Sequence, residues 1–323
     1  MNERRPRLDG RAVAALLTCC AVWGLTQVAG KLTLVEVPPL LQAAARSVGA
    51  ALLVAVWARW RGIRLLERDG TWSAGLTAGL LFAIEFGCIF TGLKFTTASR
   101  MVVFLYLAPF VVALGMPAIA RGERLDLVQT VGLIGAFSAV AWAFAEGFQR
   151  PSAGDLQWLG DALGVAGAVL WGATTLLIRA TSLSHAAPEK TLFYQLAVSG
   201  AALGVASWLA GEPWPQRLSA GPGFWLAFQI VVVCFASYLM WFWLIRHYPA
   251  TQLSAFTLLT PVFGLLAGVL MMGDPLTLRL VTALLGVSVG IALVHHGRPA
   301  RRPAAAAGEA GAELIGRRAA KPD

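Results

Sequence analysis

Long apolar runs dominate the chain, and short polar segments separate them. A helix of about 20 apolar residues spans the hydrocarbon layer of a bilayer, and ten runs qualify. Strands of a membrane barrel would alternate apolar and polar residues, and these runs do not. The sequence therefore predicts an all-α membrane protein with ten transmembrane helices. The expected helices cover residues 12–31, 38–58, 73–93, 98–120, 125–145, 159–178, 190–210, 222–245, 250–272 and 277–295.

The amino-acid composition supports the same conclusion. Of the 323 residues, 57% are hydrophobic and only 13% are charged, whereas an ordinary soluble domain has about 25% charged residues. Such a chain has too few charges to coat a water-facing surface of this size. The net charge of +9 does not indicate a nucleic-acid partner, because the basic residues lie between the apolar runs, where they set the orientation in the membrane.

The positions of Lys and Arg predict that orientation. With a cytoplasmic N-terminus, the segments on the cytoplasmic side hold 19 of these residues and the opposite segments hold 6. Cytoplasmic loops carry the excess of basic residues, so we expect a multi-pass plasma-membrane protein (inner membrane if bacterial) with both termini in the cytoplasm. The basic start could pass for a signal peptide. Its apolar run continues to about Gly30, however, which is too long, and we expect a retained first helix.

Two stretches of the sequence recur in order. The first, Trp23-Gly24-x-Thr26, matches Trp171-Gly172-x-Thr174 at an offset of 148 residues. The second begins at Leu93-Lys94 and ends at Pro109, and it matches the stretch from Ile245-Arg246 to Pro261 at an offset of 152 residues. Two ordered matches at nearly one offset indicate an internal repeat.

Each repeat holds five of the expected helices, which is an odd number. A second copy must therefore enter the membrane from the opposite side, and the two repeats are predicted to be inverted. We place them at residues 1–148 and 154–297, followed by a disordered cytoplasmic tail at 298–323. Inverted repeats are typical of secondary transporters, which bind substrate at the midplane between the halves.

Two charges lie deep within the expected spans. Arg46 is near the middle of the second helix and Glu85 near the middle of the third. A charge at this depth costs about 2.5–3.5 kcal/mol on insertion scales, so both side chains should face the bundle interior. As functional residues, Glu85 would hold a proton or a substrate amine, and Arg46 a substrate carboxylate. The alternative is that they pair with each other or with neighbouring backbone.

Other polar and aromatic residues could line a central cavity, where rings stack on a substrate and buried tyrosine or amide groups find partners. The alternative for each is simple packing between helices. The candidates are Trp23, Trp171, Thr26, Thr174, Tyr106 and Gln195. Pro109 and Pro261 occupy matching places inside helices, and each removes a backbone hydrogen bond. We expect a hinge there, or else a fixed kink that serves packing.

The sequence indicates neither a metal site nor a cofactor. The four cysteines lie inside apolar runs, and no histidine has the spacing of metal ligands. A Walker loop, a dinucleotide fingerprint and a nucleophile elbow are also missing from the sequence. We therefore expect no catalytic residues.

An ordered set of short motifs runs through the chain. Its members are Trp23-Gly24, Lys31, Arg46, Ala98-Ser99, Tyr106-Leu107-Ala108-Pro109, Gly122-Glu123-Arg124, Gly160-Asp161, Trp171, Pro261 and Gly273-Asp274. The set resembles the ten-helix EamA family of the drug/metabolite transporter superfamily over about residues 11–296. One departure is Asp274, where that family usually has Glu. The resemblance implies an exporter of amino acids, related metabolites or drugs that is proton-coupled or facilitative.

These observations predict a secondary transporter that exports small amphipathic metabolites by alternating access. Its expected partners are a small-molecule substrate, the lipid bilayer and, as candidate coupling ions, protons. One alternative is a non-transporting membrane partner or sensor, which the short loops disfavour. Another is an intramembrane lipid-modifying enzyme, for which the inventory of polar residues in the spans is too thin.

Overall fold

Every regular element in the described part of the chain is a helix, as the apolar runs predict. The computed structural model describes residues 9–119, 127–149, 151–248, 253 and 256–296. Its elements are α1 (Gly10–Thr33), α2 (Pro39–Trp60), α3 (Trp72–Gly92), α4 (Ala98–Leu105), α5 (Ala108–Ile119), α6 (Leu127–Gln149), α7 (Gln157–Ala180), η1 (Ser182–His185), α8 (Pro188–Leu209), α9 (Ala220–Ala227), η2 (Phe228–Ser237), α10 (Tyr238–His247), α12 (Leu259–Ala267), η3 (Gly268–Met272) and α13 (Leu278–His296). The predicted tail at 298–323 lies outside the described residues.

Among the described residues, eight helical stretches are long and apolar enough to cross a membrane. Two of them join several elements, because α4 and α5 form one stretch (Ala98–Ile119), and α9, η2 and α10 form another (Ala220–Leu244). Two shorter apolar helices, Leu259–Met272 and Leu278–Leu293, overlap the last two of the ten expected spans. Part of the ninth expected span, including residues 250–252, lies outside the described residues.

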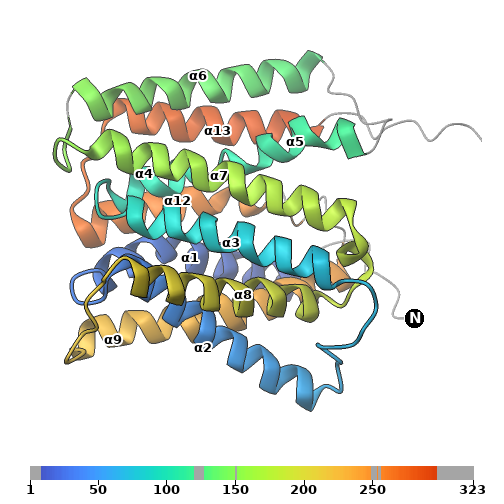
Figure 1. Cartoon of the computed structure of the whole chain (residues 1–323). Coiled ribbons are helices and arrows are strands. Elements are labelled where there is room, and N and C mark those ends of the chain that lie inside the picture. Colours follow the sequence, from blue (N-terminus) through green and yellow to red (C-terminus); the bar gives the residue numbers. More distant parts are fainter. Residues whose placement is uncertain (1–8, 120–126, 150, 249–252, 254–255, 297–323) are drawn as a thin grey trace, which may run out of the picture.

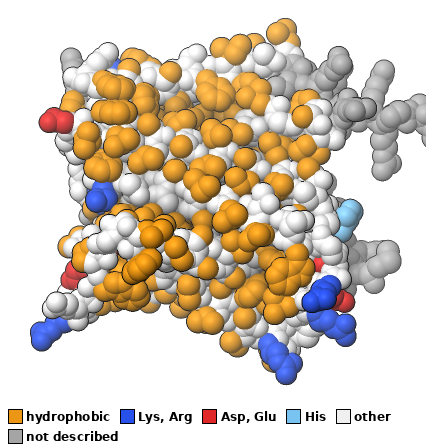
Figure 2. Space-filling view, viewed as in Figure 1, with side chains coloured by type: hydrophobic (Ala, Val, Ile, Leu, Met, Phe, Trp, Pro, Cys, Tyr) orange, Lys and Arg blue, Asp and Glu red, His pale blue; other side chains and the backbone are white. Residues whose placement is uncertain are grey.

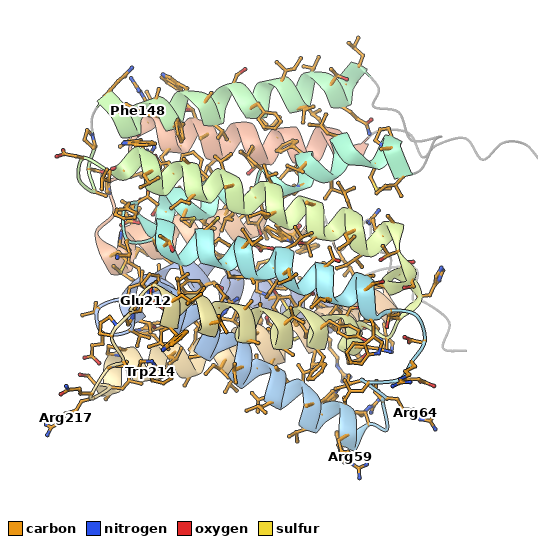
Figure 3. All side chains as sticks on the ribbon, in the orientation of Figure 1. Arg59, Arg64, Phe148, Glu212, Trp214 and Arg217 are labelled. Carbon is orange, nitrogen blue, oxygen red and sulfur yellow. The ribbon has the colours of Figure 1, made fainter. Side chains whose placement is uncertain are left out.

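The helices lie side by side and run along one common direction (Figure 1). On the face shown in Figure 2, hydrophobic side chains cover the middle, and charged side chains gather at the left and right edges. We call the end that carries Phe148 and Trp214 the left end, and the end that carries Arg59 and Arg64 the right end (Figure 3). Trp214 and Trp60 are 75% and 74% exposed. An apolar middle with tryptophans near its edges is typical of a surface that faces lipid.

The contacts between helices follow the internal repeat. α1 packs against α12, and its counterpart α7 packs against α4 and α5. α3 packs on α7 and α8, and the counterpart of α3, formed by α9 and η2, packs on α1 and α2. α2 pairs with α8, and α6 pairs with α13, so each of these helices meets its own counterpart. Exchanging the two halves therefore preserves these principal contacts.

The repeated Trp-Gly pair has a structural reason. A Cβ atom on Gly24 would lie 2.7 Å from the backbone nitrogen of Gly264 and 2.8 Å from Cβ of Phe263, both on α12. A Cβ atom on Gly172 would lie 2.6 Å from Cβ of Val111 on α5. Val111 and Phe263 each stand two residues after the matched prolines. In both halves, therefore, only glycine lets the helix approach its neighbour this closely.

The matched prolines each follow a break in a helix. α4 ends at Leu105 and α5 begins at Ala108, so the chain turns at Tyr106 and Leu107 just before Pro109. In the second half the chain turns at Leu258, and α12 begins two residues before Pro261. Proline lacks an N–H group and its ring clashes with the carbonyl four residues earlier, which interrupts a helix. The hinge role of these prolines stays a prediction.

Candidate functional site

The two charges in the middle of the spans are both buried. Arg46 on α2 is 1% exposed and Glu85 on α3 is 4% exposed. They therefore face the bundle interior, as their insertion cost requires. The helices around them are α1, α3, α8 and η2, whose apolar side chains form one core cluster with α2.

Neither charge is neutralised by a direct contact in the described part of the chain. The Nε and Nη2 atoms of Arg46 and the Oε2 atom of Glu85 are buried without a hydrogen-bond partner. The guanidinium carbon of Arg46 lies 3.7 Å from the ring centroid of Phe86 and 5.3 Å from that of Phe90. Leaving a buried charge without a polar partner is costly. An Arg46–Glu85 ion pair, one of the alternatives drawn from the sequence, is not formed here.

A helical irregularity borders this site. η2 is a π-helical stretch of ten residues (Phe228–Ser237) that turns Gln229, Val233, Cys234 and Ser237 into the interior. π-helical turns are rare in proteins, and those that occur often lie at functional sites. Tyr238, the next residue along the chain, lies within electrostatic range of Arg46 and Glu85. The site thus combines two charges, aromatic rings from α3 and polar groups from the irregular part of the η2–α10 helix.

Trp23 stands beside this site. Its indole N–H donates to Oγ of Ser237 over 2.8 Å. Its ring packs edge-on against Trp241, with centroids 5.4 Å apart, and tilts against Tyr238 at 6.4 Å. Thr26, one turn further along α1, donates to the carbonyl of Val22. Trp23 is therefore close to the site, whereas the hydroxyl of Thr26 is bonded within its own helix.

The matching tryptophan is placed differently. Trp171 is 41% exposed and packs edge-on against the buried ring of Tyr106, with centroids 6.3 Å apart. Thr174 is buried and donates to the carbonyl of Leu170 over 2.8 Å. Gln195 on α8 is half-buried and has no hydrogen-bond partner among the described residues. The structure does not bring these four candidates together with Arg46 and Glu85 through hydrogen bonds.

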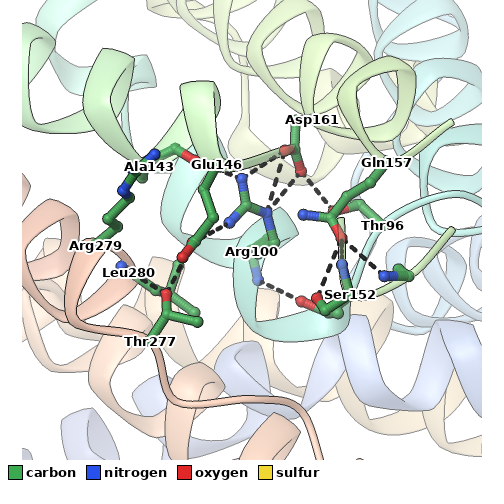
Figure 4. A network of polar contacts seen from close by, with 12 residues as sticks. Thr96, Arg100, Ala143, Glu146, Ser152, Gln157, Asp161, Thr277, Arg279 and Leu280 are labelled. Carbon is green, nitrogen blue, oxygen red and sulfur yellow. Dashed lines mark hydrogen bonds and ion pairs between the residues drawn. The ribbon is translucent and has the colours of Figure 1, made fainter. Parts of the chain in front are cut away.

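A buried ionic network at the left end was not predicted from the sequence. Nη2 of Arg100 lies 2.6 Å from Oδ2 of Asp161, and Nη1 lies 3.0 Å from Oε2 of Glu146 (Figure 4). Thr96 donates to Asp161 over 2.5 Å, and Thr277 donates to Glu146 over 2.8 Å. The network joins α4, α6, α7 and the segment before α13. Removing one partner of such a buried pair costs about 3–5 kcal/mol.

Two acidic residues lock the loops at the left end across the halves. Glu212 accepts hydrogen bonds from the backbone N–H groups of Leu40 and Leu41, at the start of α2, over 3.2 and 2.8 Å. Glu36 accepts from the backbone N–H of Ser219, the residue before α9, over 2.7 Å. Both acids therefore satisfy N–H groups at a helix start in the other half. A cavity of about 380 Å³ lies between these loops.

The right end carries an ion pair between a loop and a helix. Lys190 at the start of α8 donates to Asp69 over 2.7 Å. This bond and one from Thr71 lower the pKa of Asp69 to about 2. A lowered pKa stabilises the fold at pH values above the pKa of Asp in the unfolded chain, which is about 3.9. This contribution is lost only as the pH falls toward 2. The contact therefore persists throughout the physiological pH range.

Comparisons with known proteins give one consistent result. The sequence model of the EamA-like transporter family matches residues 10–145 and 158–295. The uncharacterized transporter YvbV of Bacillus subtilis is 26% identical over 303 residues, which are 91% of this chain and 95% of YvbV. The uncharacterized transporter YoaV of the same species is 20% identical over 283 residues, 87% of this chain and 95% of YoaV. A solved crystal structure with 21% identity has a TM-score of 0.61 and covers 90% of this chain and 99% of its own, a likeness of fold alone.

Proposed function

Because the chain belongs to the EamA-like transporter family, we propose that it is a secondary transporter that exports small amphipathic metabolites by alternating access. The family and the relatives indicate a membrane transporter rather than an enzyme. A transporter without a nucleotide-binding loop in its sequence must be driven by an ion gradient or by the gradient of its own substrate.

The observation that carries the proposal is the pair of buried, unpartnered charges at the centre of the bundle. Arg46 offers unpaired N–H groups on two nitrogen atoms, and Glu85 offers an unpaired carboxylate oxygen. Phe86 and Phe90 supply an apolar surface beside them. An amphipathic solute would place its anionic group on Arg46 and its apolar part on these rings, while Glu85 carries a proton or meets an amine.

The architecture that we propose is a pair of inverted five-helix repeats, at residues 1–148 and 154–297, with ten spans and both termini in the cytoplasm. Two observations support it. Exchanging the halves preserves the principal helix contacts, and α1 begins at the right end whereas α7 begins at the left end (Figure 1). The exposed arginines Arg59 and Arg64 at the right end fit a cytoplasmic face.

Alternating access requires that the two ends open in turn. At the left end the locks are the Arg100 network and the acids Glu36 and Glu212. At the right end Lys190 and Asp69 join α8 to the loop before α3. The breaks before Pro109 and Pro261 give each half one place at which a span bends. Opening the left end breaks the more deeply buried set of contacts.

Transport into liposomes tests the proposal. The purified chain is reconstituted, and uptake of a pool of radiolabelled standard amino acids and of ethidium is followed with and without a pH gradient. We expect uptake of at least one probe above that of empty liposomes, and loss of gradient-driven uptake in Glu85→Gln. Specific binding of a protein partner without flux of either probe would instead favour a membrane partner or sensor.

A further inference from the structure

The internal repeat relates two pairs of residues near the central site. Trp23 corresponds to Trp171 at the offset of 148 residues. The match of Leu93-Lys94 with Ile245-Arg246, at the offset of 152, places Glu85 against Ser237. Both segments between the compared positions are helical, because α3 continues to Gly92 and α10 runs from Tyr238 to His247. The register therefore holds back to Glu85 and Ser237.

Trp23 and Ser237, one residue from each pair, are joined by a hydrogen bond. Trp23 on α1 donates its indole N–H to Oγ of Ser237 over 2.8 Å. Ser237 in turn donates its hydroxyl hydrogen to the carbonyl of Val233 over 2.6 Å, so its oxygen is free to accept. Ser237 is buried, at 1% exposed. This bond joins the first helix of the first half to the third helix of the second half.

The corresponding residues, Trp171 and Glu85, are not joined by a hydrogen bond. Trp171 has no hydrogen-bond partner for its indole N–H among the described residues, and its side chain is 41% exposed. Oε2 of Glu85 is buried and has no partner either. The indole N–H of Trp171 and the carboxylate of Glu85 thus stand at the positions that correspond to the Trp23–Ser237 hydrogen bond. Neither the donor nor the acceptor is used.

The packing of α3 on α7 brings Trp171 and Glu85 to the same level along the helix axes. A Cβ atom on Gly92 would meet Leu163 and the carbonyl of Gly160, and one on Gly167 would lie 3.0 Å from Cγ1 of Ile89. As the number falls along α3 it rises along α7, so the helices are antiparallel. One turn beyond the Ile89–Gly167 contact, the register places Glu85 opposite Trp171.

We propose that Trp171 donates its indole N–H to Glu85 when the transporter takes its opposite access state, and that Trp23 then releases Ser237. The inference rests on the proposed function, since it assumes that the two inverted halves exchange roles between the access states. Trp171 is then a positioning residue that fixes the carboxylate of Glu85 in one of the two states. The bond to a carboxylate is charge-assisted and stronger than the neutral bond of Trp23.

Transport by single and double variants tests the proposal. Trp171→Phe keeps the ring and removes only the N–H donor, and Trp23→Phe is the matched control in the other half. In liposomes loaded with the amino-acid pool and ethidium, we expect Trp171→Phe to lower gradient-driven transport at least threefold. In Glu85→Gln, where substrate exchange is expected to survive, adding Trp171→Phe should not lower the rate of exchange, because the charge-assisted bond is already lost. Trp23→Phe should still lower exchange in the Glu85→Gln protein.

Cross-linking tests the proximity without any substrate. In a protein whose four native cysteines are replaced, a short bifunctional thiol reagent should cross-link the pair Trp171→Cys with Glu85→Cys, more slowly than the control pair Trp23→Cys with Ser237→Cys. The reagent is used because a direct disulfide requires Cα atoms within about 7 Å, and an indole N–H reaches its acceptor over a longer separation. If only the control pair is cross-linked, or if Trp171→Phe lowers substrate exchange in the Glu85→Gln protein, this inference is overturned while the proposed function stands. Unchanged gradient-driven transport in Glu85→Gln would overturn the proposed coupling role itself.

Discussion

In the first half of the molecule, Arg46 and Glu85 put two charges into the centre of the bundle. The second half has neutral groups at the matching positions. Glu85 corresponds to Ser237, and Arg46 corresponds to Gln195, because α2 and α8 begin at Pro39 and Pro188, each seven residues before them. The two halves thus share their packing but not their charges.

The same difference holds for the ionic network at the left end. Arg100 corresponds to Gln252 at the offset of 152 residues, and Asp161 corresponds to Val13 at the offset of 148. The sequence therefore supplies this ionic pair in one half only. In the alternating-access cycle that we propose, similar packing in the two halves would relate the two access states, and unequal charges would give these states different energies. The comparison predicts that charge substitutions act in one half and that packing substitutions act in both.

The largest effect is expected from Arg100→Gln, which gives the first half the residue type found at position 252. The change leaves the buried carboxylates of Asp161 and Glu146 without their cation, and we expect a loss of about 3–5 kcal/mol in stability. Thermal unfolding in detergent measures it, with the exposed Arg217→Gln as the matched control. Adding Asp161→Asn should recover part of the loss, and a fully stable Arg100→Gln protein would contradict this role of the network.

Packing substitutions should act equally in the two halves. Gly24→Ala and Gly172→Ala each force a methyl group to within 3 Å of the neighbouring helix, so each should cost about 1–3 kcal/mol. Gly135→Ala is the control, because a Cβ atom there would meet nothing within 4 Å. Unfolding temperatures that fall for one of the two glycines only would show that the halves do not share their packing.

Much of the fold could be predicted from the sequence, because lipid imposes simple requirements. Apolar runs of spanning length gave the helices, and the cost of buried charge placed Arg46 and Glu85 inside the bundle. The repeated Trp-Gly pair pointed to equivalent helices, and the glycine contacts supply the reason. The break of the fourth span into α4 and α5 follows from Pro109.

The rest depends on contacts between residues far apart in the chain. The partner of Arg100 is not evident from the sequence, because Asp161 stands 61 residues further on at the start of another span. The available signal was that one apolar run has Arg near its start and another has Asp near its start, which could have indicated an ion pair. The π-helical stretch η2 could not be predicted either, because its segment is almost entirely apolar and the spacing of its residues does not distinguish it from an α-helix. The different settings of Trp23 and Trp171 could not be predicted, because the two residues belong to the same sequence motif.

Glu85→Gln should remove the proton-carrying group while preserving its shape. Gradient-driven transport should fall more than about tenfold, or about 1.4 kcal/mol in the coupled step. Exchange of substrate across the membrane should survive, because exchange need not move protons. Liposome assays between about pH 5 and 9 compare the variant with the wild type and with the exposed Glu67→Gln. An unchanged rate and pH profile would make Glu85 a structural acid and would remove the main difference between the halves.

Arg46→Gln makes the halves alike at the second central position and should have the smallest effect. The guanidinium lies on the ring of Phe86 with unpaired donors, so we expect it to bind an anionic group of the substrate. Apparent affinity for carboxylate-bearing probes should fall about fivefold, or about 1 kcal/mol, while transport of the cation ethidium should not weaken. Gln195→Leu, at the matching position, should change either affinity less than about twofold. The double variant Arg46→Gln with Gln195→Arg moves the charge to the other half, where Tyr238 corresponds to Phe86 but the neutral Ser237 corresponds to Glu85. Recovery of anion affinity in that protein would show that the charge matters and its half does not, whereas continued weakness would tie recognition to the first half.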